Sequence, residues 1–199
     1  MMEKVKDIFT REAEAIRNIP VNGFYNDVVE AIYERVHRGK GKVISSGMGK
    51  AGQIAHSIAT TLSATGTPAV FLHPSEAQHG DLGIIQENDI LFVISNSGRT
   101  REILELLDLV SALHKGIPVI VLTGNSDSRL AESADHLLLT GDPAEVCMLG
   151  LTPTTSTTVM AVIGDAIVVL LQEKIGFTKK DYAKRHHGGY LGQKSRDET

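Results

Sequence analysis

The pattern of apolar and polar positions divides the chain into segments of two kinds. Residues 3–38 carry apolar residues at helical spacing, in two pieces that break near Pro20 and end at Gly39. From residue 42 onward, short runs rich in β-branched residues hardly alternate with polar ones, which is typical of strands buried on both faces of a parallel sheet. Five strands are therefore expected, at residues 42–46, 68–72, 89–95, 118–123 and 136–140.

Helical patterns separate these strands. They predict helices at residues 50–64, 100–114, 127–133 and 154–175, the last ending at Gly176. The alternation of strands with helices predicts right-handed crossovers and helices on both faces of the sheet. We expect an α/β fold: a doubly wound five-stranded parallel sheet flanked by helices, in a Rossmann-like three-layer sandwich. A single domain is expected over residues 1–199, with N-terminal helices (1–38), an α/β core (39–176) and a C-terminal tail (177–199).

The composition is that of an ordinary globular protein and excludes a disordered chain, with 42% hydrophobic and 22% charged residues. The absence of Trp and the net charge of −4 argue against a nucleic-acid partner. The N-terminus has no apolar signal core. The most apolar stretch, Val159–Leu171, contains Asp165 and is shorter than a bilayer span. With a single cysteine, Cys147, no disulfide can form within the chain, and we expect a soluble cytoplasmic protein without a membrane partner.

Ligands of an open parallel sheet bind beyond the carboxyl ends of its strands, and three of these ends are rich in Gly, Ser and Thr. The first, SSGMGKAG (45–52), allows backbone to approach a ligand closely, although its spacing fits an ordinary tight turn equally well. The second, SNSGRT (95–100), places three hydroxyls around Gly98 at a helix start, which favours a phosphate cradle over simple capping. The third, LTPTTSTT (151–158), has more hydroxyls than capping needs and indicates a polar ligand lining.

Two loops rich in histidine, residues 73–81 and 184–192, raise the question of a metal site. No fixed metal-binding spacing such as H-E-x-x-H is present, and histidines are common in polar surface loops. We therefore expect no metal and no other cofactor.

Six segments, taken in order, resemble the SIS (sugar isomerase) domain family. They are SSGMGKAG (45–52), HPSEAQHGDLG (73–83), SNSGRTREI (95–103), EVCMLGLTPTTST (145–157), GDA (164–166) and GFTKKDYAKRHHGG (176–189). The resemblance extends from about residue 3 to residue 192, and within the family it is to the D-arabinose-5-phosphate isomerases.

This resemblance implies an aldose–ketose isomerase that interconverts D-ribulose 5-phosphate and D-arabinose 5-phosphate through an enediol(ate). The product would supply synthesis of 3-deoxy-D-manno-octulosonate (KDO) for lipopolysaccharide or capsule. The resemblance also implies a homotetramer whose active sites are shared between subunits, with the C-terminal tail contributing to a site. Longer members carry two CBS repeats, which this chain is expected to lack.

The resemblance also assigns residues. Catalytic roles fall to Lys50, His79, Glu102, Glu145 and His186, and substrate or phosphate binding falls to Ser46, Gly47, Ser95, Ser97, Thr100, Thr155 and Ser156. The favoured division makes Glu145 the proton-transfer base, gives ring opening to His186 or His79, and uses Lys50 to stabilise the oxyanion. The chain departs from the family at Arg99, usually acidic, and at Met148 and His187, each of which replaces a proline.

Two alternatives stay open, the second of them from a different functional class. One is another SIS phosphosugar isomerase, of the 6-phospho-3-hexuloisomerase type, against which the HGD loop and the H-x-GG tail argue. The other is a non-catalytic regulator that binds a sugar phosphate. The presence of Lys50, Glu102, Glu145 and His186 favours an enzyme over a regulator.

Overall fold

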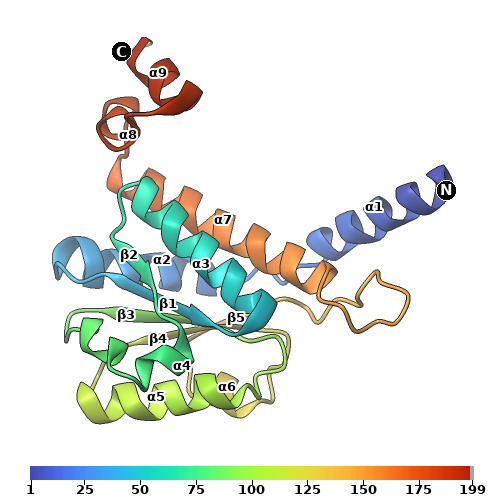
Figure 1. Cartoon of the computed structure of the whole chain (residues 1–199), viewed down its shortest axis with the longest axis horizontal. Coiled ribbons are helices and arrows are strands. Elements are labelled where there is room, and N and C mark those ends of the chain that lie inside the picture. The colour runs from blue at the N-terminus through green and yellow to red at the C-terminus, as the bar shows by residue number, and fades with distance from the viewer. Residues whose placement is uncertain (198–199) are drawn as a thin grey trace.

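The computed structural model describes residues 1–197 and confirms the expected α/β architecture (Figure 1). Five strands, all parallel, form one sheet in the order β2-β1-β3-β4-β5. They are β1 (Val43–Gly47), β2 (Ala69–Phe71), β3 (Ile90–Ile94), β4 (Val119–Thr123) and β5 (His136–Leu139). The chain therefore reverses its direction of winding between β1 and β3, which is where an open sheet forms a ligand crevice.

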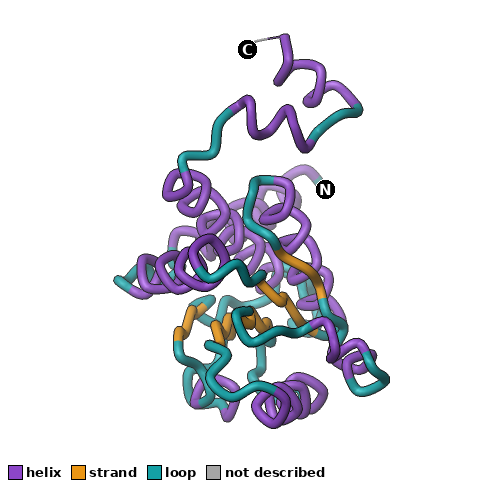
Figure 2. Tube along the Cα trace, turned by 90° about the vertical axis from the view of Figure 1, so that its left-hand side faces the viewer, coloured by secondary structure: helices purple, strands orange, loops and turns teal. Residues whose placement is uncertain are grey.

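The helices cover both faces of this sheet. They are α1 (Met2–Arg17), α2 (Phe24–Ile32) with a π-helical turn (Tyr33–Arg38), α3 (Gly49–Ala64), α4 (Pro74–Ala77) with a 3₁₀ turn (Asp81–Ile84), α5 (Arg101–Leu113), α6 (Arg129–Glu132), α7 (Thr155–Ile175), α8 (Lys179–Arg185) and α9 (Gly189–Asp197). Helices α2, α3 and α7 lie on one face and α4, α5 and α6 on the other, as Figures 1 and 2 show.

The core explains why the strand sequences do not alternate. Every residue of β3 is buried, because Phe92 packs toward α3 and α7 while Leu91 and Val93 pack toward α5. Each predicted strand and helix of the core lies within two residues of its observed bounds. The run of unalternating apolar residues is thus a reliable mark of a strand covered on both sides.

The segment interpreted as a C-terminal tail contains two helices, α8 and α9. A reciprocal capping box starts α8, in which Asp181 N–H donates to the Thr178 hydroxyl and Thr178 N–H donates to the Asp181 carboxylate. The two helices pack on each other and stand clear of the sandwich in both views (Figures 1 and 2). No residue of α8 is buried, so the tail gains little from its own domain.

Helix α7 extends beyond the apolar stretch Val159–Leu171 at both ends and confirms the helix predicted over residues 154–175. Within residues 1–197 it alone is long and apolar enough to cross a membrane by length and composition, and half of the tested window is buried inside the fold. The central helix of a packed core passes the same test, and α7 packs against α1, α2 and α3.

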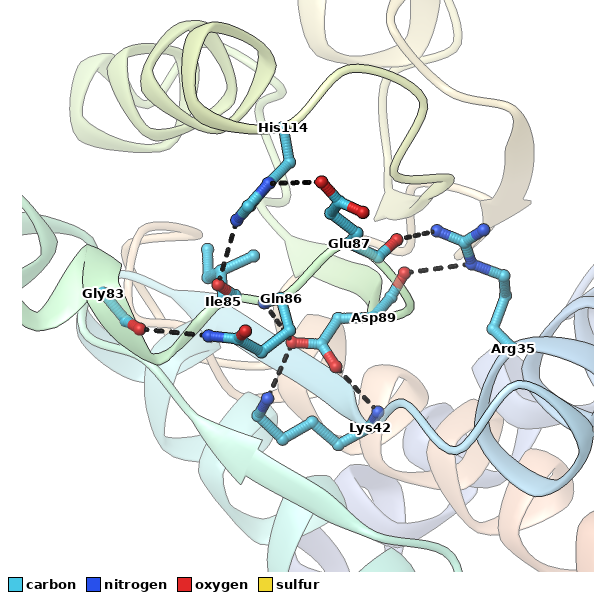
Figure 3. A network of polar contacts seen from close by, with 8 residues as sticks. All are labelled: Arg35, Lys42, Gly83, Ile85, Gln86, Glu87, Asp89 and His114. Atoms are coloured by element: carbon cyan, nitrogen blue, oxygen red, sulfur yellow. Dashed lines mark hydrogen bonds and ion pairs between the residues drawn. The ribbon is translucent and has the colours of Figure 1, made fainter.

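A polar network, which we call the Asp89 network, fixes the amino ends of the central strands (Figure 3). Asp89 is fully buried and accepts hydrogen bonds from the Lys42 N–H at 2.9 Å and the Lys42 ammonium at 2.7 Å. The N–H of Gln86 donates to the same carboxylate at 2.8 Å. From the π-helical turn, Arg35 donates to the carbonyls of Asp89 and Glu87. These contacts join β1, β3 and the α2 segment at the end of the sheet opposite the ligand crevice.

Candidate functional site

A cavity of about 630 Å³ lies at the carboxyl ends of β1 and β3. Its walls come from the turns after these strands, the loop of residues 142–153, and the first turns of α7. Six of the predicted site residues line it: Lys50, Ser95, Ser97, Thr100, Glu145 and Ser156. Segments more than 100 residues apart in the sequence thus meet at the point where the sheet reverses its winding.

The turn after β3 forms a cradle of hydroxyls, defined by Ser95, Ser97 and Thr100. The hydroxyls of Ser95 and Thr100 hydrogen-bond each other at 2.7 Å. Although Thr100 is the N-cap residue of α5, its side chain makes no capping hydrogen bond. The start of α5 therefore keeps N–H donors for a ligand, which favours an anion cradle over capping as the role of these hydroxyls.

Gly98 is required by the shape of this cradle. Its φ of +63° is one that residues with a side chain rarely adopt. A Cβ at this position would also lie 2.0 Å from the hydroxyl of Ser128, which caps the start of α6. The turn can close over α6 only because residue 98 has no side chain.

Three helices of eight or more residues, α3, α5 and α7, begin at this edge of the sheet beside the cavity. The partial positive charge at each helix start favours an anion there. Lys50, in the first turn of α3, is exposed at the cavity and adds a full positive charge. The electrostatics of the cavity therefore suit a small anionic group such as a phosphate.

Glu145 is bound to the start of α7. One carboxylate oxygen accepts from the N–H and the hydroxyl of Thr154 at 2.7 and 2.8 Å, and the other accepts from the hydroxyl of Ser156. Burial by itself raises the pKa of Glu145, but the hydrogen bonds from Ser156 and Thr154 outweigh it and hold the pKa below its ordinary value. At neutral pH the side chain is a carboxylate, able to accept a proton at the cavity wall.

Three predicted binding residues lie outside the lining of this cavity. The buried hydroxyl of Ser46 donates to the carbonyl of Leu72 at 2.7 Å. The buried hydroxyl of Thr155 is turned toward α1. Gly47 lines a neighbouring hollow with His56. The hydroxyls of Ser46 and Thr155 are thus engaged by the protein itself in this structure.

Three predicted catalytic residues also lie outside the lining. Glu102 is half-buried in the first turn of α5, and His79 is exposed in the loop after α4. His186 ends α8 in the projecting tail, where its ring stacks on Tyr182 with centroids 3.6 Å apart. Within one chain, the fold does not bring His186 to the cavity.

Helix α1 supplies neighbours of the site that sequence reasoning missed. Arg11 donates to the carbonyl of Glu145, and Glu12 accepts from the hydroxyl of Thr155. More than 130 residues separate the partners in each pair, and no local pattern joins them. The sequence carries no signal for such a contact, because α1 has the ordinary pattern of an amphipathic helix.

Cys147, in the same loop as Glu145, is a further residue that the sequence reasoning did not assign. Its sulfur accepts a hydrogen bond from the N–H of Thr152 at 3.2 Å, and this bond, against a smaller opposing effect of burial, lowers the pKa of the thiol to about 7. Among residues 1–197, no group of three or more His, Cys, Asp and Glu side chains is placed to hold a metal ion.

Comparisons with known proteins point to one family. The family model of the SIS domain matches residues 38–170. A curated relative from Pseudomonas aeruginosa, named arabinose 5-phosphate isomerase KdsD, is 47% identical over 169 residues, which cover 85% of this chain and 51% of the relative. The chain spans about half the length of the curated relatives it matches.

Two solved structures match nearly the whole chain. A Bacteroides fragilis protein, described as a candidate phosphosugar isomerase involved in capsule formation, is 60% identical with a TM-score of 0.94, covering 96% of this chain and 99% of that one. An Escherichia coli CFT073 protein solved in complex with arabinose 5-phosphate is 34% identical with a TM-score of 0.85, covering 93% of this chain and 96% of that one.

Proposed function

The chain belongs to the SIS domain family, and on this premise we propose that it is an aldose–ketose isomerase interconverting D-ribulose 5-phosphate and D-arabinose 5-phosphate. The observation that carries the proposal is the composition of one cavity. A hydroxyl cradle at a helix start, an ammonium and an ionised carboxylate line the same space, as sugar phosphate isomerisation requires. The relative bound to arabinose 5-phosphate and the curated KdsD relatives support this choice of substrate.

The phosphate of the substrate would sit on the cradle of Ser95, Ser97 and Thr100. Free N–H groups at the start of α5 and the ammonium of Lys50 complement its charge. Binding energy at the phosphate, remote from the reacting carbons, holds the sugar against Glu145.

Glu145 would move the proton between C1 and C2 through an enediol(ate). It abstracts the proton beside the carbonyl and returns it to the neighbouring carbon, while Lys50 stabilises the charge on the oxygen. In the structure, Thr154 and Ser156 donate to Glu145. When these hydroxyls turn to oxygens of the sugar, the carboxylate loses donors and becomes a stronger base.

Ring opening of the cyclic aldose requires a further acid–base group, which we assign to His186 or His79. The tail that carries His186 stands clear of its own domain. We propose a homotetramer in which this tail reaches the cavity of a neighbouring subunit, so that each site is shared. The protein would act in the cytoplasm, without a nucleic-acid or membrane partner, and its product would feed KDO synthesis for lipopolysaccharide or capsule.

A panel of pentose, hexose and hexulose phosphates, followed by NMR in deuterium oxide, tests the proposal. D-arabinose 5-phosphate should be converted to D-ribulose 5-phosphate with deuterium entering at C1 of the ketose and, by the reverse reaction, at C2 of the aldose. Free D-arabinose should turn over very poorly. Faster turnover of a 3-hexulose 6-phosphate would replace the proposal with a hexuloisomerase. Tight binding of sugar phosphates without deuterium incorporation would indicate a regulator instead.

A further inference from the structure

The peptide bond between Glu145 and Val146 is held at both of its polar ends. A guanidinium N–H of Arg11 donates to the carbonyl of Glu145 at 3.2 Å. The N–H of Val146 donates to the hydroxyl of Thr155 at 3.2 Å, and this hydroxyl donates to the carboxylate of Glu12 at 3.0 Å. Both anchors are consecutive residues of α1, a helix remote in sequence from the loop that they hold.

The direction of these hydrogen bonds is fixed by the number of protons available. A hydroxyl has one proton to donate, and Thr155 gives it to Glu12, so its lone pairs are turned to the N–H of Val146. Thr155 is 1% exposed, which makes the loss of either bond costly. The other oxygen of Glu12 is buried and has no partner among the described residues, so the carboxylate depends on Thr155.

Among the described residues, the hydrogen bonds of Arg11 and Glu12 are the polar links between α1 and this part of the site. No residue of α1 is fully buried, and a hollow of about 240 Å³ lies between Ala15 of the helix and Pro143 of the loop. The loop has no regular secondary structure between β5 and α7. The polar contacts of Arg11 and Glu12 therefore hold the loop beside this hollow.

We propose that Arg11 and Glu12 are positioning residues that set the place of the Glu145 carboxylate in the cavity. The side chain of Glu145 is fixed by the start of α7, and its peptide bond is fixed from α1. The carboxylate is thus located from both sides, as accurate proton transfer requires. This proposal rests on the proposed isomerase function, in which Glu145 is the base.

The test compares variants of the full chain in turnover of D-arabinose 5-phosphate. Glu12→Ala should lower kcat about 10-fold with KM within about twofold, because the phosphate cradle is untouched. Thr155→Val should lose a similar factor, and the double variant should lose little more, since both remove the same link. Glu12→Gln keeps an acceptor oxygen and should retain most of the activity. Glu3→Ala, the same charge change at an exposed position of α1, should match the unaltered chain.

Two further readouts separate positioning from simple stability. The acid limb of the kcat/KM profile, which reports the free enzyme, should move to higher pH in Glu12→Ala, because a misplaced Glu145 loses the hydrogen bonds that lower its pKa. Alkylation of Cys147, two residues along the loop, should become severalfold faster, since the loop is freer to expose its thiol.

The outcomes distinguish the two proposals. If the unaltered chain turns over no pentose phosphate, the isomerase function fails and positioning for that reaction fails with it. If the unaltered chain does convert D-arabinose 5-phosphate, but Glu12→Ala leaves kcat, the pH profile and the alkylation rate unchanged, then only the positioning role is overturned.

Discussion

At the scale of single residues, Glu145 both caps α7 and faces the cavity. In Glu145→Gln the amide keeps the shape of the side chain but cannot accept the proton. We expect kcat to fall by roughly 10²–10⁴-fold with KM little changed, and deuterium exchange at C2 to fall in parallel. Steady-state kinetics and NMR exchange measure both. If Glu145→Gln keeps its kcat and its deuterium exchange, the base is instead Glu102 or His186.

Ser97→Ala should behave differently. It should mainly raise KM, because phosphate contacts are similar in the ground state and the transition state.

The pKa of Glu145 also sets a pH dependence. Because the folded pKa lies below that of the unfolded chain, the ionised carboxylate stabilises the fold at neutral pH. This contribution is lost as the pH falls through the unfolded and then the folded pKa. Thermal melts between pH 7 and acid should therefore show a steeper loss of Tm in the unaltered chain than in Glu145→Gln. Parallel curves for the two proteins would contradict the capping role.

At the scale of elements, α3 approaches β1 so closely that a glycine is required at residue 52. A Cβ there would lie 2.5 Å from the carbonyl oxygen of Gly47, a backbone atom that has little freedom to move. Alanine in a helix gains about 1 kcal/mol over glycine, but overpacking costs about 1–3 kcal/mol. Gly52→Ala should therefore lower the free energy of unfolding by up to about 2 kcal/mol. Denaturant titration measures the free energy of unfolding, with Gln53→Ala at an exposed position of α3 as the control. If Gly52→Ala stabilised the protein, β1 would have moved to make room for the added methyl group.

The elements also differ in how well the sequence predicts them. The pattern predicts the strands and core helices within two residues, because burial on both faces leaves an unalternating apolar run that amphipathic helices and half-exposed strands do not show. It predicts the hydroxyl cradle because parallel strands end at one edge. It misses the helices of the tail, since polar segments of seven to nine residues carry no core-facing stripe. The contact of Arg11 with Glu145 depends on tertiary packing alone.

At the scale of the whole molecule, stability and chemistry lie at opposite ends of the strands. The Asp89 network joins the amino ends, and the cavity lies at the carboxyl ends (Figure 3). Asp89→Asn removes the charge opposite the Lys42 ammonium and should cost about 3 kcal/mol of stability. Its kcat below the melting transition should be unchanged. The control is Glu87→Gln, the same charge change on a side chain that is 86% exposed. Equal melting of the two variants would contradict the importance of the buried pair.

The proposal that each site is shared between subunits predicts complementation. Lys50→Ala and His186→Ala chains should each have little activity alone. After mixing and exchange of subunits, about a quarter of the sites should combine a cavity with its lysine and a tail with its histidine. Activity should then return to about that fraction of the unaltered enzyme. No recovery after exchange has been shown by mass spectrometry would mean that each chain builds its own site.

The stacked rings of Tyr182 and His186 have an optical consequence. The chain contains no tryptophan and four tyrosines, so its ultraviolet emission comes from tyrosine alone. An imidazole in face contact with a phenol is well placed to quench that emission. If His186 moves onto a sugar in the cavity of another subunit, the two rings separate and the fluorescence of Tyr182 should increase. If each site is shared as proposed, the emission of Tyr182 should therefore report the docking of the tail without any label.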